Sequence, residues 1–388
     1  MNNIKELDNQ YIANTYARFP VCIVEGKGSL AYDENGKEYI DLSTGIAVNT
    51  FGYADDAWVS AVETQLKKLQ HTSNLYYSEP SARLAELLCT KTGMKKVFFS
   101  NSGAEANECA IKVARKYGES KKGADYTTII TLKDSFHGRT LTTLAATGQE
   151  VFHKDFLPLT NGFVHAEPNN AEDVKRLLND NKCCAIMFEV VQGEGGVLPL
   201  KKEFLTELQK LAQEYDVLLI ADEVQCGNGR TGELYGYMNF DITPDVVSTA
   251  KGLVGGLPMG ATLLGDKVKD ILGVSMHGST FGGNPVCAAG ALNIISRLDA
   301  DTLAGVKERS EYIFNELSNA KGVKSVSGLG LMIGIETERP AAEIIDECRE
   351  NGVLVIKAKQ KLRLLPALNI DMELLKKSIQ IIKEACAK

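Results

Sequence analysis

At 388 residues, the chain is too long for one compact core, which predicts two domains of unequal size. A hydrophobic content of 44% and a charged content of 24% are typical of globular proteins. The net charge of -7 argues against general nucleic-acid binding, and no apolar run approaches the roughly 20 residues that span a membrane. The nine cysteines lack a C-x-x-C pair and indicate small core residues in a reducing compartment, so a cytoplasmic protein is expected.

The chain begins with a polar arm and a small antiparallel unit. Residues 1–20 carry scattered aromatic side chains and are predicted to pack on something else, such as a second subunit. Residues 21–41 alternate in polarity around a polar turn, which predicts a hairpin or meander. The spacing of apolar residues then predicts helices at 55–70 and 80–91.

From about residue 96, strands and helices alternate along the chain. Apolar runs predict strands at 97–99, 127–132, 185–190, 217–221 and 246–249, with helices after residue 102 and at 204–215. Such strands, nearly continuous in apolar residues and separated by helices, predict a mostly parallel sheet covered by helices.

The C-terminal part predicts a smaller α/β domain. A long helix is expected from about 288 to 320, followed by strands near 329–335, 353–356 and 362–365 and a closing helix after 371. We expect the N-terminal meander to complete this unit. The predicted division is a large domain of residues 51–289 and a small domain made of 1–50 and 290–388.

Ligands of open parallel sheets bind beyond the carboxyl ends of the strands, so residues that follow predicted strands are the candidates for a site. They are Ser102-Gly103-Ala104, Phe136-His137-Gly138-Arg139, Glu189 with Gln192 and Glu194, Asp222 with Gln225, and Lys251. Each alone has a simple structural explanation, such as a helix cap, a packed aromatic ring or a surface charge. Together, an acid and a lysine at two strand ends can hold a charged heterocycle and bond covalently to its aldehyde.

Residues 222–232 also allow two other interpretations. Asp222 and Glu223 would suit magnesium in a nucleotide hydrolase, but the chain has no G-x-x-x-x-G-K-[ST] phosphate loop. Residues 227–232 match G-x-G-x-x-G, which would indicate a dinucleotide-dependent oxidoreductase. That fingerprint must lie directly between a strand and a helix, whereas here residues 222–225 intervene and no clear helix follows before Pro244.

Five motifs in combination carry a family resemblance. They are NSGAEA (101–106), FHGRT (136–140), QGEGG (192–196), DEVQ (222–225) and HGSTFGGN (277–284). With Lys251, they resemble the class III (fold-type I) pyridoxal-phosphate aminotransferases, and the resemblance covers essentially the whole chain. It implies an enzyme with a large, mostly parallel α/β domain and a smaller α/β domain, with pyridoxal 5′-phosphate as cofactor and no metal.

The resemblance also implies roles for individual residues at the cofactor. Lys251 would bond covalently to the aldehyde and later, as a free amine, move a proton between substrate and cofactor. Asp222 would hold the pyridinium proton. Further contacts are implied for Ser102, Gly103, Ala104, Phe136, His137, Glu223, Val224, Gln225 and Thr280, the last from the neighbouring subunit of a homodimer.

For the substrate, the resemblance implies carboxylate binding by Arg139, with Ser279 nearby. Glu194 and Arg363 match a pair that opens to let the arginine bind the α-carboxylate of glutamate; an ordinary interdomain salt bridge is the alternative. The motifs resemble most the branch that uses N2-acetylornithine and 2-oxoglutarate in arginine biosynthesis. Ornithine, succinylornithine and 4-aminobutyrate are alternative donors, and a non-catalytic cofactor-binding protein is an alternative of another class.

Overall fold

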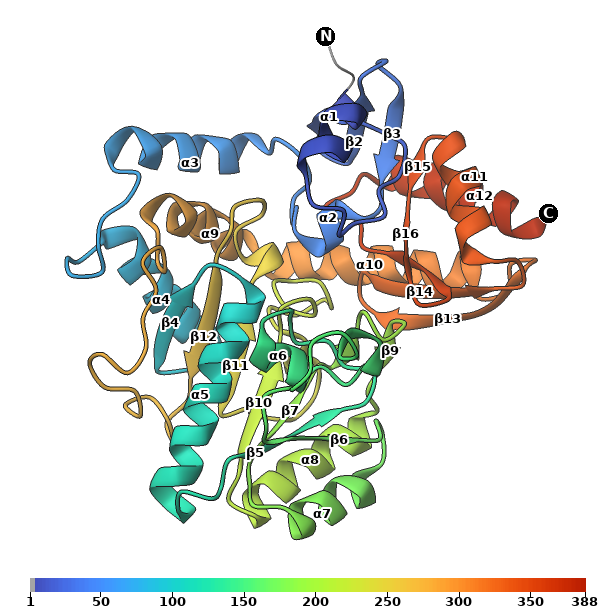
Figure 1. Cartoon of the computed structure of the whole chain (residues 1–388). Helices are drawn as coiled ribbons and strands as arrows, with labels where there is room; N and C mark the ends of the chain where they lie inside the picture. The colour runs from blue at the N-terminus through green and yellow to red at the C-terminus, as the bar shows by residue number, and fades with distance from the viewer. Residues whose placement is uncertain (1–3) are drawn as a thin grey trace.

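The computed structural model describes residues 4–388, and its largest element is a seven-stranded sheet between helices (Figure 1). The strand order is β4-β12-β11-β10-β7-β5-β6; β12 runs antiparallel to both neighbours, and the other pairs are parallel. The bounds are β4 (Lys96–Ser100), β5 (Thr128–Leu132), β6 (Phe163–Ala166), β7 (Cys183–Phe188), β10 (Leu218–Asp222), β11 (Val246–Thr249) and β12 (Gly260–Leu264). The predicted, mostly parallel sheet is confirmed, although the sequence analysis did not anticipate β6 or β12.

The central strands β7 and β10 are buried along their whole length because helices cover both faces of the sheet. Neighbouring residues point to opposite faces, so Ala185 and Leu218 pack in one apolar cluster while Ile186 and Leu219 pack in another. Helix α5 (Gly103–Lys122) covers the first face, and α7 (Ala171–Asp180) and α8 (Lys202–Glu214) cover the second. This two-sided burial explains why the strands contain nearly continuous apolar runs.

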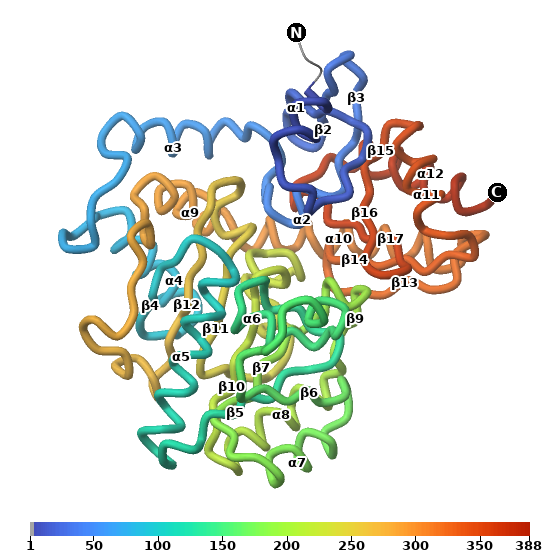
Figure 2. Tube along the Cα trace, viewed as in Figure 1, coloured from blue at the N-terminus to red at the C-terminus, as the bar shows by residue number. Residues whose placement is uncertain are grey.

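An N-terminal and a C-terminal segment lie side by side in space, as the blue β3 and the red β15 in Figure 1 and the trace in Figure 2 show. A four-stranded sheet has the order β1-β2-β3-β15, in which the C-terminal β15 pairs in parallel with β3 of the N-terminal meander. These strands are β1 (Ile23–Lys27), β2 (Leu30–Asp33), β3 (Glu38–Asp41) and β15 (Val353–Leu354). The pairing favours the grouping of residues 1–50 with 290–388, and the domain division stays a prediction.

A second four-stranded sheet near the C-terminus has the order β13-β14-β17-β16. Its strands are β13 (Val323–Leu329), β14 (Met332–Thr337), β16 (Ile356–Ala358) and β17 (Lys361–Leu364), and a separate pair joins β8 (Val191–Gln192) to β9 (Leu198–Pro199). Further α-helices are α1 (Ile4–Tyr11), α2 (Thr44–Ala47), α3 (Asp56–Lys68), α4 (Glu79–Thr92), α6 (Leu141–Ala146), α11 (Ala341–Glu350) and α12 (Met372–Ala387). None of the helices within residues 4–388 is long and apolar enough to cross a membrane.

The prediction of a single long helix from about 288 to 320 is wrong. Two helices occupy this stretch, α9 (Pro285–Arg297) and α10 (Ala300–Leu317). Asp299 is the N-cap of α10, and its side chain accepts a hydrogen bond from the backbone N–H of Thr302 at 2.9 Å. A capping aspartate starts a new helix because it satisfies an N–H group that has no partner within the helix.

Glu223, the residue after β10, fixes the segment that follows the strand. Its buried carboxylate accepts hydrogen bonds from the backbone N–H groups of Gly236, at 2.7 Å, and Tyr237, at 2.8 Å. Burial raises the pKa of Glu223 from 4.5 to about 8, against the opposing effect of these two hydrogen bonds. Glu223 therefore stabilises the fold by pairing two backbone donors that would otherwise be buried without acceptors.

We expect Glu223→Gln to lower the free energy of unfolding by about 1–3 kcal/mol, because a side-chain amide cannot accept both hydrogen bonds. Because the pKa of Glu223 is raised in the folded state, this residue makes the native protein lose stability as pH rises from about 4.5 to about 8. The variant lacks this titrating group, so the difference in unfolding free energy between the two proteins should shrink over that range. Urea denaturation at about pH 5 and pH 8 measures both effects. The exposed Glu214→Gln is the control, and an equal loss at both pH values would contradict the pKa shift.

Candidate active site

A cavity of about 680 Å³ lies beyond the carboxyl ends of β7 and β10. Most of the predicted site residues line it: Ser102, Gly103, Ala104, Phe136, His137, Arg139, Asp222, Val224, Gln225 and Lys251. Tyr16, Asn107 and Glu189 line it as well. This volume suits a small cofactor together with a substrate, and the position is the one that parallel sheets offer to ligands.

The N-terminus of α5 forms one wall of the cavity. Ser102 is the N-cap, and its hydroxyl accepts a hydrogen bond from the backbone N–H of Glu105 at 3.2 Å. The N–H groups of Gly103 and Ala104 belong to the first turn and have no partner within the helix, so they can bind an anion such as phosphate. A Cβ atom on residue 103 would lie 2.6 Å from Cγ1 of Val224, so only glycine permits this close approach.

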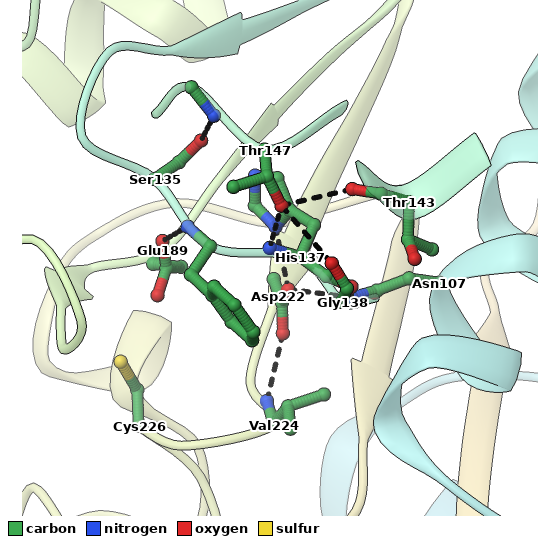
Figure 3. Close-up of polar contacts among 12 residues, drawn as sticks. Asn107, Ser135, His137, Gly138, Thr143, Thr147, Glu189, Asp222, Val224 and Cys226 are labelled. Atoms are coloured by element: carbon green, nitrogen blue, oxygen red, sulfur yellow. Dashed lines mark hydrogen bonds and ion pairs between the residues drawn. The ribbon is translucent and has the colours of Figure 1, made fainter. Parts of the chain in front are cut away.

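Asp222 ends β10, and three groups fix its carboxylate (Figure 3). Oδ2 accepts a hydrogen bond from Asn107 Nδ2 at 2.8 Å and lies 2.7 Å from His137 Nδ1, while Oδ1 accepts one from the backbone N–H of Val224 at 3.0 Å. Burial alone would lower the pKa of His137, but the hydrogen bond and charge of Asp222 outweigh it and raise this pKa. The carboxylate therefore lies in one orientation, with two partners on Oδ2 and one on Oδ1.

Asn107 is a residue of this hydrogen-bond network that was not predicted from the sequence. Besides Asp222, its amide donates to the backbone carbonyl of His137 at 2.8 Å. The residue lies one helical turn after Gly103, and residues four apart lie on the same side of a helix. That spacing within the NSGAEAN stretch is the signal that would have placed Asn107 on the cavity side of the helix.

Lys251 follows β11 and lines the cavity from the neighbouring strand end. No hydrogen-bond partner for its Nζ occurs among residues 4–388, and burial lowers the pKa of the amine below 10.5. An unpaired amine, a fixed carboxylate and a helix N-terminus thus surround one cavity. This set of groups fits pyridoxal 5′-phosphate, which carries an aldehyde, a basic ring nitrogen and a phosphate.

Two arginines lie at or beside the cavity, and their guanidinium groups have different partners. Arg139 lines the cavity, whereas buried Arg363 lies behind Gln225 and does not line it. The guanidinium of Arg139 lies over the ring of Phe152, 4.1 Å from its centroid, and has no hydrogen-bond acceptor among the described residues. Arg363 NH1 instead lies 2.6 Å from Glu194 Oε1 and also donates to Gln225 Oε1 at 3.3 Å. Burial would raise the pKa of Glu194, but the charge and hydrogen bonds of Arg363 outweigh it and lower this pKa.

The structure does not bring five predicted site residues to the lining of this cavity: Glu194, Glu223, Ser279, Thr280 and Arg363. Glu194 and Arg363 both bond to Gln225, which does line it. Glu223 points away from it, because successive residues of an extended strand face opposite sides. Ser279 and Thr280 line a separate cavity of about 440 Å³, which Asn101 separates from the first. Asn101 Nδ2 donates to Ser279 Oγ at 3.0 Å, so Ser279 lies behind that side chain.

The alternative sites of the sequence analysis find no support in the geometry. Within residues 4–388, no group of three or more His, Cys, Asp or Glu side chains is placed to hold a metal ion. The glycine-rich stretch 227–232 packs against the C-terminal sheet, where buried Arg230 donates to the carbonyls of Leu331 at 3.1 Å and Pro366 at 2.5 Å. No α-helix follows this loop directly, so it lacks the context of dinucleotide binding.

Comparison with known proteins agrees with this geometry. The family model for aminotransferase class-III matches residues 11–386. The acetylornithine aminotransferase of Haemophilus ducreyi is 49% identical over 100% of this chain and 99% of its own, and the succinylornithine transaminase of Citrobacter koseri is 41% identical over 99% and 97%. The structure of ornithine aminotransferase from Toxoplasma gondii, solved with partial occupancy of pyridoxal phosphate at its active site, matches with a TM-score of 0.94 and 28% identity over 99% and 93%. The chain therefore belongs to the class-III aminotransferases, which are pyridoxal-phosphate-dependent enzymes.

Proposed function

We propose that this aminotransferase moves the δ-amino group of N2-acetyl-L-ornithine to 2-oxoglutarate. The products are N-acetyl-L-glutamate 5-semialdehyde and L-glutamate, a step of arginine biosynthesis. The observation that carries the proposal is the 49% identity, over the whole chain, to a relative named acetylornithine aminotransferase. A cytoplasmic location is part of the proposal, and the nine free cysteines support it.

Bound pyridoxal phosphate supplies an aldehyde that takes up the amino group and a ring that withdraws electrons from the reacting carbon. Asp222 would keep the ring nitrogen protonated, and the N–H groups of Gly103 and Ala104 would hold the phosphate. Phe136 and Val224, which also line the cavity, would pack against the ring. Nζ of Lys251 removes the proton from the carbon that bears the amino group, and its lowered pKa favours the neutral amine that this role requires.

Substrate selection rests on the two arginines. Arg139, which has a free guanidinium, binds the α-carboxylate of the donor and the side-chain carboxylate of glutamate. When Glu194 pairs with Arg363, the space beside Lys251 has no net charge and accepts the uncharged chain next to a δ-amine. When the pair opens, Arg363 binds the α-carboxylate of glutamate. The 2.6 Å separation of the pair and its position beside Gln225 support this switch.

The proposed enzyme is a homodimer in which Thr280 completes the phosphate site of the partner subunit. Thr280 lies outside the cavity of its own chain, next to the exposed ring of Phe281. Leu75, Tyr76 and Tyr77 are exposed apolar side chains as well, and Asn74 beside them donates to the carbonyls of Ser279 and Gly282. Apolar side chains gathered around such a loop are typical of a subunit interface.

The choice of donor is tested by single half-reactions. We expect kcat/KM for N2-acetylornithine to exceed the values for ornithine and 4-aminobutyrate by at least about tenfold. The loss of the visible absorption of the lysine-bound cofactor measures each half-reaction, and 2-oxoglutarate should restore it. A preference for N2-succinylornithine, ornithine or 4-aminobutyrate would overturn the choice of substrate and leave the aminotransferase activity in place.

We expect Arg363→Ala to raise KM for glutamate and 2-oxoglutarate by about 100-fold, because a charge-assisted pair of hydrogen bonds is lost. The half-reaction with the δ-amino donor should change by less than about tenfold, since Arg363 serves there only to neutralise Glu194. Arg176→Ala, which breaks an ion pair with Asp173 away from the cavity, is the control. An equal loss in both half-reactions would identify an ordinary salt bridge.

A complementation experiment tests the shared site. In a mixed dimer of Lys251→Ala and Thr280→Ala subunits, one site would contain both native residues, because Thr280 comes from the other chain. Co-expression in equal amounts gives about half mixed dimers with one intact site of two, so about a quarter of the native activity should return. Activity no higher than that of the parent variants would show that Thr280 does not serve the partner's site.

A further inference from the structure

Lys251 has a backbone conformation that L-amino acids rarely adopt. Its φ angle is 47°, in the left-handed region, and the residue is neither a glycine nor an asparagine. Such a conformation costs roughly 1–2 kcal/mol for a residue with a Cβ atom, and it persists only where the surroundings hold it. Since β11 ends at Thr249, this backbone angle sets the direction in which the lysine side chain leaves the strand end.

Two buried side chains bond to the backbone carbonyls of the residues before and after Lys251. Asn228 Nδ2 donates to the carbonyl of Ala250, the residue before it, at 3.0 Å. Thr50 Oγ1 donates to the carbonyl of Gly252, the residue after it, at 2.7 Å. Thr50 is 2% exposed and Asn228 is 3% exposed, so water does not replace either bond. We name Thr50 and Asn228 the lysine clamp.

The clamp residues are themselves held in place. Asn228 lies in the glycine-rich loop and also donates to Thr249 Oγ1 at 3.0 Å, while the carbonyl of Thr50 accepts from the backbone N–H of Leu368 at 2.9 Å. A Cβ atom at residue 252 would lie 2.9 Å from Thr50 Oγ1, so glycine is needed for the threonine to come so close. The clamp thus joins Lys251 to segments far from it in the sequence.

We infer that Thr50 and Asn228 are positioning residues that hold Lys251 in its strained conformation and aim its amine into the cavity. The inference rests on the proposed role of Lys251 in bonding to the cofactor and moving a proton. Neither clamp residue touches the reacting atoms; each acts through the backbone carbonyl of a residue next to the lysine. Without the clamp, residue 251 can relax to a right-handed φ, which moves Nζ, and a displacement of about 1 Å can cost about 100-fold in rate.

The test uses the full-length holoenzyme and its apoprotein. Thr50→Val keeps the shape of the side chain and removes the donor, and Thr50→Ser restores the hydroxyl. Asn228→Gly is an independent variant, because glycine accepts the φ of 57° at that position and only the side-chain donor is lost. Thr337→Val is the matched control: Thr337 is 6% exposed and also donates to a backbone carbonyl at 2.7 Å, but in β14, away from the cavity.

Two readouts separate positioning from simple stabilisation. The first is the rate at which apoprotein and pyridoxal phosphate develop the visible absorption of the lysine-bound cofactor. The second is kcat and KM of both half-reactions. We expect Thr50→Val and Asn228→Gly to slow cofactor attachment and to lower both kcat values by about 10- to 100-fold. KM for 2-oxoglutarate should change by less than about threefold, because the two arginines are untouched.

Thr50→Ser should return both rates to within about threefold of the native values, and Thr337→Val should leave them unchanged even if its melting temperature falls. Folded Thr50→Val and Asn228→Gly proteins with native attachment rates and kcat would overturn the clamp and leave the proposed function intact. Lys251→Ala separates the two proposals. If that variant still develops the absorption of the native protein, the role of Lys251 fails, and the clamp fails with it.

Discussion

At the end of β10, the carboxylate of Asp222 meets the Asn107 amide, the His137 ring and the backbone N–H of Val224. These partners come from helix α5, from the loop after β5 and from the turn after β10 itself, so the carboxylate is fixed only when the sheet and α5 are assembled. A buried charge needs such partners, because desolvation would otherwise favour its neutral form. In the proposed function, the orientation of Asp222 determines where the ring nitrogen of the cofactor would lie.

The charged side chains at and near the cavity differ in whether they have an ion-pair partner. Among residues 4–388, Lys251 and Arg139 have no carboxylate partner, whereas Arg363 is paired with Glu194. Burial lowers the pKa of Lys251, and in the proposed function Arg139 would be available to an anionic substrate. In the proposed function, the paired arginine would become available only when Glu194 moves, which would give the space beside Gln225 two electrostatic states.

The strained backbone of Lys251 links this electrostatic arrangement to the fold as a whole. Thr50 comes from the N-terminal segment and Asn228 from the glycine-rich loop, and both bond beside the lysine. Leu368 of the C-terminal segment bonds in turn to Thr50. The glycine-rich loop, which formally matches a dinucleotide fingerprint, therefore has a structural position: Asn228 bonds beside Lys251, and Arg230 bonds to the C-terminal part. The packing partners of this loop, and not its G-x-G-x-x-G pattern, therefore define its structural role.

The sequence by itself determined the family, the parallel sheet and most of the residues that line the cavity. It could do so because strand ends in a parallel sheet converge on one edge, and because motifs such as FHGRT and DEVQ keep fixed places relative to those ends. Only the tertiary structure decided which face of the strand Glu223 occupies, that Asn107 completes the Asp222 network, and that Ser279 and Thr280 lie outside their own chain's cavity. It also decided the break between α9 and α10 and the approach of Thr50 to Gly252. These features depend on contacts between residues far apart in the chain, about which local periodicity and motif spacing carry no information.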